Sequence, residues 1–277
     1  MQNAALAALG LDWRYLALEV HPDDLRSAIQ GAKTMGFIGL NLTVPHKLLA
    51  VDLVDVIDPA AKMWGAVNTV RFEALDSKGS WRPVGQFTGE TPKEVRSHGF
   101  NTDADAITRS IREDLGIELR GITVLLLGAG GAGRVAALKL AAAGVAQLYL
   151  VNRTMNKAEE IAREIRERNP EVKIQTGYPT GTVDLVLNAT SLGLKAGDGI
   201  PLDASAFSPG RAGAAYDMIY RPAETPFLAA AKAAGVRTAN GVGMLLYQGA
   251  RALELWTGRE APVNVMREAL LKNIYGG

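Results

Sequence analysis

The chain has 277 residues, a formal net charge of +1, and 48% hydrophobic and 21% charged residues, so it is long enough for more than one domain. It contains no cysteine, which excludes disulfides and thiolate metal sites and favours a reducing cytoplasm as its location. The near-zero charge gives no electrostatic reason to expect nucleic acid or an anionic membrane as a partner.

Helical and strand patterns alternate along the whole chain and predict an α/β fold with largely parallel sheets. In the first hundred residues the predicted elements are a helix at 1–9, strands at 15–20, 37–42 and 65–72, and helices that open at Pro22 and follow Lys47. Residues 73–98 hold several Gly and Pro among mixed charges, which predicts a long loop or hairpin excursion, most simply a surface insertion.

The rest of the chain alternates more regularly. A helix is predicted at 103–115, where Ile107, Ile111 and Leu115 recur at helical spacing and Gly116 ends the pattern. Strands are predicted at 122–127, 147–151, 183–187, 213–218 and around Val236, and helices at 132–143, 156–168, 227–234, 242–257 and 263–271. No apolar run approaches the roughly 20 residues needed to span a bilayer.

A glycine-rich turn directly follows the apolar strand at 122–127 and opens the next helix. Gly128, Gly130 and Gly133 supply G-x-G-x-x-G, in which the first glycine permits a tight turn, the second lets a pyrophosphate approach the backbone, and the third allows close helix–strand packing. Phosphates would face free N–H groups at the helix N-terminus. The alternative is a turn that serves packing alone. The strand–turn–helix–strand context favours a βαβ unit over 122–152 that binds a nicotinamide dinucleotide.

The end of the next strand indicates which dinucleotide is bound. An NAD-preferring protein usually has Asp or Glu there against the ribose 2′-hydroxyl, whereas this chain has Asn152, Arg153 and Thr154, with Lys157 one helical turn beyond. A guanidinium can make bidentate contacts with a 2′-phosphate, and a carboxylate would repel it. NADP is therefore predicted; the alternative is that these cations are ordinary solvated surface charges.

Polar residues also interrupt apolar or sharply turning segments outside this unit. They include Thr43 and Lys47 after a predicted strand, Asn68 within one, and Asp103 at a helix N-terminus. Such side chains, together with Tyr220 and Gln248, suit a small polyhydroxylated acid if the fold brings them together. Taken singly, Asp103 can be only an N-cap, Asn68 a turn residue and Lys47 a solvated charge. The histidines His21, His46 and His98 lack metal-ligand spacing, so no metal site is expected.

Eight motifs in order along almost the whole chain resemble the shikimate dehydrogenase family. They are Asn-Leu-Thr-Val-Pro-His-Lys at 41–47, Gly-Ala-Val-Asn-Thr at 65–69, Asn-Thr-Asp at 101–103, Gly-Ala-Gly-Gly-Ala at 128–132, Asn-Arg-Thr at 152–154, Asn-Ala-Thr-Ser-Leu-Gly at 188–193, residues 217–222, and Gly-Val-Gly-Met-Leu-Leu-Tyr-Gln at 241–248. The family reduces 3-dehydroshikimate to shikimate with NADPH. The resemblance implies the same reaction here, with a shikimate or quinate dehydrogenase of relaxed specificity and a non-catalytic NADP-binding relative as alternatives.

The resemblance also implies a role for each matching residue. Lys47 and Asp103 would be the catalytic pair beside the reacting oxygen, and Thr43, Asn68, Tyr220 and Gln248 would bind the substrate. The implied cofactor-binding residues are Gly128, Ala129, Gly130, Gly131, Ala132, Asn152, Arg153, Thr154, Lys157, Asn188, Ala189, Thr190, Ser191, Met218 and Gly241. Two domains are implied with a cleft between them: 1–103 completed by 241–277 for the substrate, and a Rossmann-like domain at 104–240 for NADP. The protein is expected to be a monomer or a homodimer.

The sequence departs from the family in two places. The family begins with a strand and a Ser-x-Ser-Pro segment that binds the substrate carboxylate, whereas this sequence starts at residues that match the following helix. An upstream start is expected, because loss of a sheet strand would leave backbone groups unpaired. The second departure is the excursion at 73–98, which is longer than the family's usual hairpin and lies between Asn68 and Asp103.

Overall fold

A computed structural model describes residues 1–87 and 94–276, and it divides the chain into two compact units. The first unit comprises Met1–Asp103 with Leu246–Gly277, and the second comprises Ala104–Leu245. The second unit therefore ends five residues after the expected boundary at 240, within the long helix α9 (Val242–Thr257). Each unit has its own sheet and its own buried core.

The sheet of the first unit is mostly antiparallel, which corrects the prediction of largely parallel sheets for this half of the chain. Its strands are β1 (Gly39–Asn41), β2 (Val56–Ile57), β3 (Thr69–Leu75), β4 (Trp81–Pro83) and β5 (Val95–Phe100), in the order β1-β3-β5-β2 with β4 paired to β3. Among the pairs that the described residues form in this sheet, only β2 and β5 run parallel. The short connection at residues 76–80 joins β3 to β4, and short connections of this kind produce antiparallel neighbours.

Helices cover this sheet. They are α1 (Gln2–Ala8), α2 (Leu25–Thr34) after the 3-10 turn Pro22–Asp24, α3 (His46–Leu49), α4 (Pro59–Trp64), and α10 (Val263–Tyr275), with further 3-10 turns at Ala50–Asp52 and Val84–Gln86. Leu25, Ile29 and Ala32 recur at helical spacing on α2 and pack into a core with Val70 and Phe72 of β3. Helix α1 packs against α10, so the two ends of the first unit lie together.

The strand predicted at 15–20 is wrong. The segment has no regular secondary structure, and Leu16 and Leu18 are 68% and 63% exposed. Side-chain bonds hold it instead: the Tyr15 N–H donates to Oδ1 of Asn3 at 2.7 Å, and the Tyr15 hydroxyl donates to Oδ1 of Asn41 at 3.0 Å. Alternating hydrophobicity predicts an extended chain, but a strand also requires a neighbouring backbone to pair with.

The excursion predicted at 73–98 is also corrected at both of its ends. Residues 73–75 continue β3, and 95–98 lie in β5, where Glu73 pairs with Arg96 and Phe72 with Ser97. Residues 81–83 form β4 and pair with β3, so Pro83 of the predicted loop itself lies in a strand. Residues 88–93, which include Gly89 and Pro92 of the predicted loop, lie outside the described residues.

A buried carboxylate joins these two strands. Glu73 is 2% exposed and bonds to Arg71 beside it on β3 and to Arg96 and His98 on β5, with His98 Nδ1 3.0 Å from Oε1. Burial raises the pKa of Glu73, but the hydrogen bonds from His98, Arg71 and Arg96 outweigh it and lower that pKa from 4.5 to about 2. The carboxylate form therefore stabilises the folded sheet.

This cluster predicts an acid-dependent loss of stability. Because the pKa of Glu73 is lower in the folded than in the unfolded chain, its contribution is present above pH 4.5 and is lost as the pH falls toward about 2. The loss from this one group amounts to about 3 kcal/mol in the free energy of unfolding. Urea unfolding across this pH range measures it.

Glu73→Gln is the informative variant, because it leaves Arg71, Arg96 and His98 beside a neutral group. We expect it to be about 3–5 kcal/mol less stable than the wild type near neutral pH and to lose less on acidification. Glu160→Gln, an exposed position on helix α7 (Met155–Arg168), is the control and should follow the wild type. An acid profile for Glu73→Gln parallel to that of the wild type would contradict the assignment.

The second unit contains a parallel six-stranded sheet, as its alternating pattern predicts. The strands are β6 (Thr123–Leu127), β7 (Gln147–Val151), β8 (Lys173–Thr176), β9 (Val183–Asn188), β10 (Ala212–Asp217) and β11 (Arg237–Ala239), in the order β11-β10-β9-β6-β7-β8. Strand β8 is not among the predicted elements. The helices are α5 (Asp103–Leu115), α6 (Gly131–Ala142), α7, α8 (Pro226–Ala233) and the 3-10 turn Pro209–Arg211.

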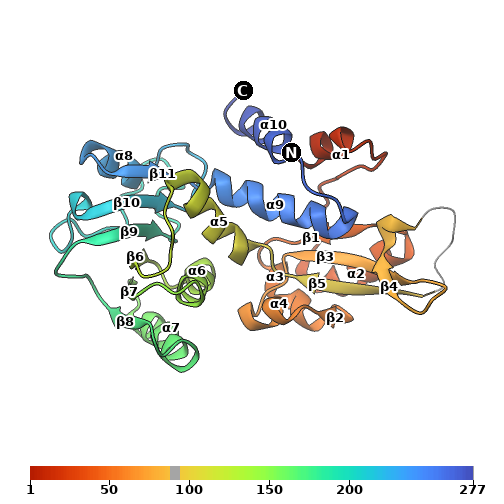
Figure 1. Cartoon of the computed structure of the whole chain (residues 1–277), viewed down its shortest axis with the longest axis horizontal. Helices are drawn as coiled ribbons and strands as arrows, with labels where there is room; N and C mark the ends of the chain where they lie inside the picture. The colour runs from red at the N-terminus through yellow and green to blue at the C-terminus, as the bar shows by residue number, and fades with distance from the viewer. Residues whose placement is uncertain (88–93, 277) are drawn as a thin grey trace. The chain divides into compact units, whose positions relative to one another are not determined.

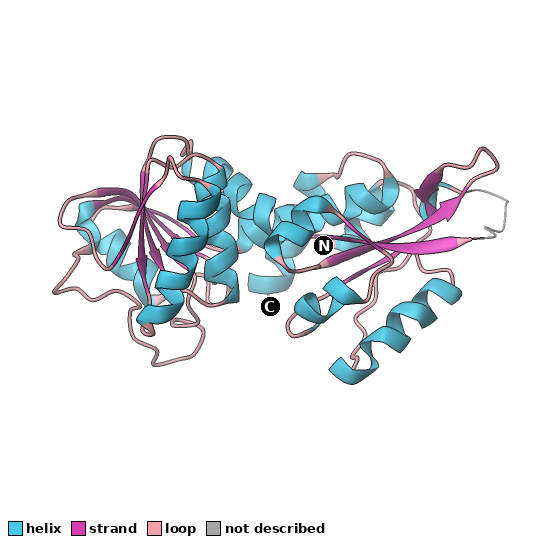
Figure 2. Cartoon of the chain, turned by 90° about the horizontal axis from the view of Figure 1, so that it is seen from below, coloured by secondary structure: helices cyan, strands magenta, loops and turns pink. Residues whose placement is uncertain are grey.

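The strand order reverses at β6, and this reversal decides which face each helix covers. The crossovers through α6 and α7 step away from β9, whereas the crossover through α8 steps the opposite way, from β10 to β11. Because crossovers share one hand, α6 and α7 cover one face and α8 the other (Figures 1 and 2). The carboxyl ends of β6 and β9 lie at the point of reversal, where such sheets bind ligands.

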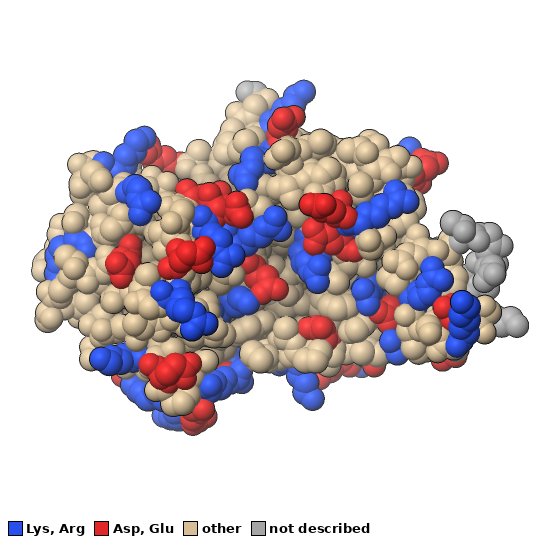
Figure 3. All heavy atoms as spheres, viewed as in Figure 1, with Lys and Arg blue, Asp and Glu red and all other residues tan. Residues whose placement is uncertain are grey.

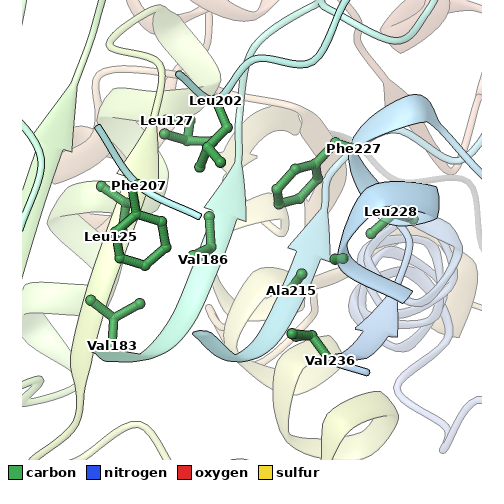
Figure 4. Close-up of a cluster of buried hydrophobic side chains, with 11 residues drawn as sticks. Leu125, Leu127, Val183, Val186, Leu202, Phe207, Ala215, Phe227, Leu228 and Val236 are labelled. Atoms are coloured by element: carbon green, nitrogen blue, oxygen red, sulfur yellow. The ribbon is translucent and has the colours of Figure 1, made fainter. Parts of the chain in front are cut away.

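The face under α8 carries the core drawn in Figure 4. A cross-strand row of Leu125, Val186 and Ala215 is buried there against Phe207 and Phe227. At about 25 cal/mol per Å² of buried apolar surface, such large side chains contribute most of the stability of the layer. On the outer surface seen in Figure 3, Lys and Arg lie interspersed with Asp and Glu.

Candidate functional site

Lys47 and Asp103 meet in the first unit. Nζ of Lys47 lies 2.7 Å from Oδ2 of Asp103, and the two side chains are 24% and 16% exposed. Lys47 is on the short helix α3, whose backbone is tied to the strand region by a bond from the Val67 N–H to the Lys47 carbonyl at 2.8 Å. Asp103 opens α5, where its N–H donates to Oδ1 of Asn101 at 3.1 Å. Hydrogen bonds to the backbone of Lys47 and of Asp103 therefore fix the position of each residue, while both side chains remain partly exposed.

Asn68 lies beside this pair at the start of β3 but is 1% exposed. Its Oδ1 accepts from the Thr102 N–H at 2.8 Å and from the Thr69 hydroxyl at 3.1 Å, and its Nδ2 donates to the Thr102 hydroxyl at 3.0 Å. Asn41 donates to the Asn68 carbonyl at 3.2 Å. In this arrangement the Asn68 side chain links β3 to the residue before Asp103, so direct contact with a substrate stays a prediction.

The other predicted substrate residues are placed differently. Thr43 is exposed just before α3, and its carbonyl accepts from the Lys47 N–H at 3.2 Å, so it belongs to the same turn as the catalytic candidate. Gln248 lies on α9 in the first unit and is half-buried. Tyr220 belongs to the second unit, follows β10, and is 38% exposed. The structure thus brings Lys47, Asp103, Thr43 and Asn68 into one unit with Gln248.

All of the predicted cofactor residues lie at or near the carboxyl edge of the six-stranded sheet. Backbone bonds link each loop of this edge to the next: Gly241 N–H to the Ile219 carbonyl at 3.0 Å, Met218 N–H to Asn188 at 3.0 Å, Ala189 N–H to Leu127 at 2.8 Å, and Gly128 N–H to Val151 at 2.7 Å. Gly241 has no room for a side chain, because a Cβ would lie 2.1 Å from the Met218 carbonyl oxygen. Backbone hydrogen bonds therefore connect these loops along the carboxyl edge of the sheet.

The glycine turn has the geometry that its spacing predicts. Gly128 has φ +107° and packs against Ala189, while a Cβ on Gly133 would lie 2.2 Å from the Gly128 oxygen. Over Gly130 and Gly131, by contrast, the space within 4 Å of a Cβ is open, and both residues are exposed at the start of α6. Tight packing at Gly128 and Gly133, with open space over the backbone of Gly130 and Gly131, suits a pyrophosphate bound at the N-terminus of α6.

This contrast yields a stability prediction. Gly133→Ala should lower the free energy of unfolding by about 1–3 kcal/mol, because the new Cβ overpacks against the Gly128 backbone. Gly131→Ala, two residues earlier in the same helical turn, should be neutral or slightly stabilising, since its Cβ enters open space. Urea unfolding of the two variants measures the difference, and equal stabilities would show that the turn relaxes freely.

The side chain of Asn152 is used inside the protein. Its Oδ1 accepts from the Ala129 N–H at 3.0 Å and its Nδ2 donates to the Thr154 carbonyl at 2.8 Å, so it joins the glycine turn to the basic turn. Arg153 and Lys157 are exposed, and within the described residues neither forms an ion pair. Both cations therefore remain available to an anionic ligand.

Residues 188–191 follow β9 and approach the glycine turn. Thr190 N–H and its hydroxyl donate to Oδ1 of Asn188 at 2.9 and 2.8 Å, and its methyl group faces Gly128. Asn188 is fully buried, whereas Ser191 is exposed. The loop that would line the nicotinamide side is thus anchored by Asn188 beneath it.

Several residues of this architecture were not singled out as site residues from the sequence. Asn41, Asn101 and Thr102 organise the Lys47–Asp103 region, and Asp217 and Thr225 organise the loops after β9 and β10. Thr225 carries a local signal, since a Thr before Pro is a typical helix N-cap and its hydroxyl accepts from the Leu228 N–H at 3.3 Å. Asn41, Asn101, Thr102 and Asp217 lie within the family motifs at 41–47, 101–103 and 217–222, but the motifs alone do not give their contacts. These contacts depend on long-range pairings.

Across residues 1–87 and 94–276, the acidic and histidine side chains form no group of three or more that could hold a metal ion. Among the helices of the same residues, none combines the length and hydrophobicity that a membrane crossing requires.

Three family descriptions match successive parts of the chain. Residues 1–70 match the shikimate dehydrogenase substrate binding domain, residues 110–192 match shikimate / quinate 5-dehydrogenase, and residues 241–271 match the shikimate 5′-dehydrogenase C-terminal domain. These ranges include the regions of Lys47, the glycine turn and Gln248.

Individual proteins agree along nearly the full length. A shikimate dehydrogenase (NADP(+)) of Geobacter metallireducens is 40% identical over 98% of this chain and 90% of its own. A crystal structure of a shikimate dehydrogenase in complex with NADP+ superposes with a TM-score of 0.82 at 33% identity, covering 99% of this chain and 89% of that one. A 5-ketofructose reductase of Gluconobacter sp. strain CHM43 gives 0.80 at 33% identity, covering 99% and 92%. The chain belongs to the shikimate dehydrogenase family.

Proposed function

We propose that the chain catalyses the reversible reduction of 3-dehydroshikimate to shikimate with NADPH. The observation that carries this proposal is the 2.7 Å ion pair between Lys47 and Asp103, two partly buried side chains at positions that match the family's catalytic motifs. The unit that contains them binds the substrate, and the unit with the parallel sheet binds the cofactor. The family and its NADP-dependent members support this assignment.

The pair supplies what ketone reduction needs from the protein. Addition of hydride to a carbonyl carbon leaves negative charge on oxygen, which requires a proton or a nearby cation. The Lys47 ammonium beside that oxygen stabilises the charge and has a proton to give. Asp103 holds the Lys47 side chain in place through the ion pair, in which Nζ lies 2.7 Å from Oδ2. Thr43, Asn68 and Gln248 of the same unit hold the ring hydroxyls and the carboxylate.

The residues of the second unit suit NADP. The open backbone at Gly130 and Gly131 accepts the pyrophosphate at the start of α6, and Arg153 and Lys157 provide positive charge for the 2′-phosphate. The loops at 188–191 and at Met218 and Gly241 line the nicotinamide side. When bound, the cofactor supplies the hydride.

Initial rates with a panel of substrates test the proposal. Shikimate and quinate are each assayed with NADP+ and NAD+, and 5-ketofructose is assayed with NADPH, because a structural neighbour is named for that activity. We expect the highest kcat/KM for shikimate with NADP+. Faster oxidation of quinate would establish the shikimate / quinate alternative, and reduction of 5-ketofructose alone would replace the proposed substrate. If the chain binds NADP+ but turns over none of these substrates, the assignment as an enzyme is contradicted.

A further inference from the structure

The strongest unassigned feature of the second unit is the carboxylate of Asp217. It ends β10, is 0% exposed, and receives three donors: Asn188 Nδ2 and the Ile219 N–H at 3.0 Å on Oδ1, and the Thr225 hydroxyl at 2.6 Å on Oδ2. Within the described part of the chain no cation forms an ion pair with it. Burial raises the pKa of Asp217, although the hydrogen bonds from Thr225, Ile219 and Asn188 oppose that rise.

On one side, Asp217 determines which way the Asn188 amide points. A carboxylate only accepts hydrogen bonds, so it selects the NH2 end of Asn188 and leaves Oδ1 facing the opposite way. That oxygen accepts both the N–H and the hydroxyl of Thr190, at 2.9 and 2.8 Å, and the Thr190 hydroxyl in turn accepts from the Leu192 N–H at 3.1 Å. Nδ2 of Asn188 also donates to the Leu192 carbonyl at 3.3 Å, so Asp217 and the backbone of the loop after β9 together hold the Asn188 amide in this orientation.

On the other side, Asp217 closes the loop after β10. Its bonds to the Ile219 N–H and the Thr225 hydroxyl hold the two ends of residues 219–225, between which Tyr220 lies. Thr225 also packs against Gly193, where a Cβ would lie 3.1 Å from the Thr225 Cβ, so the two loops touch above the buried carboxylate. One side chain thus joins the loop that carries Thr190 to the loop that carries Met218.

We propose that Asp217 is a positioning residue that holds these two loops in the arrangement needed to seat the nicotinamide ring. The inference rests on the proposed function for the identity of the ring. A residue in this role affects the nicotinamide half of the cofactor and leaves the adenosine half, at the glycine turn and Arg153, unaffected. Adenosine 2′,5′-bisphosphate, which lacks the nicotinamide, is therefore the discriminating probe.

The experiment compares dissociation constants for NADP+ and for adenosine 2′,5′-bisphosphate by isothermal titration calorimetry. Asp217→Ala removes both acceptor oxygens and so all three hydrogen bonds, and hydrogen bonds to a charged group of this kind correspond to about 10- to 100-fold in an equilibrium constant. We expect NADP+ to bind at least about tenfold more weakly, with the bisphosphate within about twofold of the wild type. With shikimate, kcat should fall and the KM for NADP+ rise, while the KM for shikimate changes little.

Asp217→Asn should recover part of the loss, because its oxygen can still face Asn188 and Ile219 while the Thr225 hydroxyl turns to accept from its amide. Should Asp217→Ala fail to fold, Thr225→Val breaks the network from the other side and should also weaken NADP+ selectively. Ser110→Ala is the matched control: Ser110 is equally buried in this unit, within 2.7 Å of both Asp114 and Tyr216, and lies on α5.

Two results would overturn the inference. The first is an unchanged ratio of the two dissociation constants in both Asp217 variants, and the second is a change in that ratio in Ser110→Ala of the same size, which would mark a general effect of lost stability. Failure of the proposed function is separate, because it would show as absence of turnover in the wild-type chain while the binding comparison still reports on Asp217.

Discussion

Replacement of Lys47 by alanine is expected to lower kcat for shikimate oxidation by about 10²- to 10⁴-fold, the usual contribution of a positioned acid–base group. The variant removes the ammonium group whose Nζ lies 2.7 Å from Oδ2 of Asp103. Because Lys47 is in the first unit and the glycine turn in the second, calorimetric binding of NADP+ should be unchanged. Initial rates together with that binding measurement check both halves of the expectation.

Two further variants sharpen this prediction. Lys62→Ala removes an exposed lysine from α4 of the same unit and should keep wild-type rates. Lys47→Arg keeps the positive charge, but a guanidinium does not give up its proton in proteins. Recovery of activity by arginine would indicate that charge stabilisation suffices, and no recovery would indicate proton transfer from Lys47. A Lys47→Ala variant within tenfold of the wild type would remove Lys47 from the chemistry.

Replacement of Arg153 by aspartate is expected to reverse much of the preference for NADP. The change removes a bidentate partner of the 2′-phosphate and adds a like charge beside it, and each charge-assisted bond contributes about 1.5–3 kcal/mol. We therefore expect kcat/KM with NADP+ to fall by about 100-fold or more, with a much smaller change for NAD+. Binding of adenosine 2′,5′-bisphosphate should weaken in parallel.

Lys173→Asp is the matched control for this charge reversal. Lys173 is exposed in the same unit but begins β8, at the amino edge of the parallel sheet, away from the carboxyl edge where Arg153 follows β7. It should leave both cofactors unaffected. Equal losses for NADP+ and NAD+ in Arg153→Asp would mean that Arg153 binds a part that the two cofactors share.

Local patterns predicted the second unit well because its elements follow local rules. The helix at 103–115 and the strand at 147–151 coincide with α5 and β7. The strand–glycine–helix pattern predicted the turn at Gly128 correctly. Tight backbone contacts such as that of Gly133 admit only glycine, so the sequence must have glycine at these positions. Buried parallel strands also read as continuous apolar runs.

The first unit was predicted less well because strand pairing is not local. The alternation at 15–20 favours an extended chain equally whether or not a partner strand lies beside it. The Gly and Pro residues of 73–98 concealed the end of β3 and most of β5, two strands that pair with each other. The mostly antiparallel arrangement of this sheet likewise depends on which strands pair, and local sequence patterns do not specify that.

The sequence by itself determined the residue types of the site: a glycine turn, Arg153 and Lys157, and the polar residues Lys47 and Asp103, each with a chemical reason that is independent of the fold. Only the tertiary structure decided which of them meet. It brought Lys47 within 2.7 Å of Asp103 across 56 positions of sequence, directed the Asn152 side chain inward, and placed Asp217 beneath two loops. Contacts of this kind follow from strand order and burial, which arise from the packing of the whole unit.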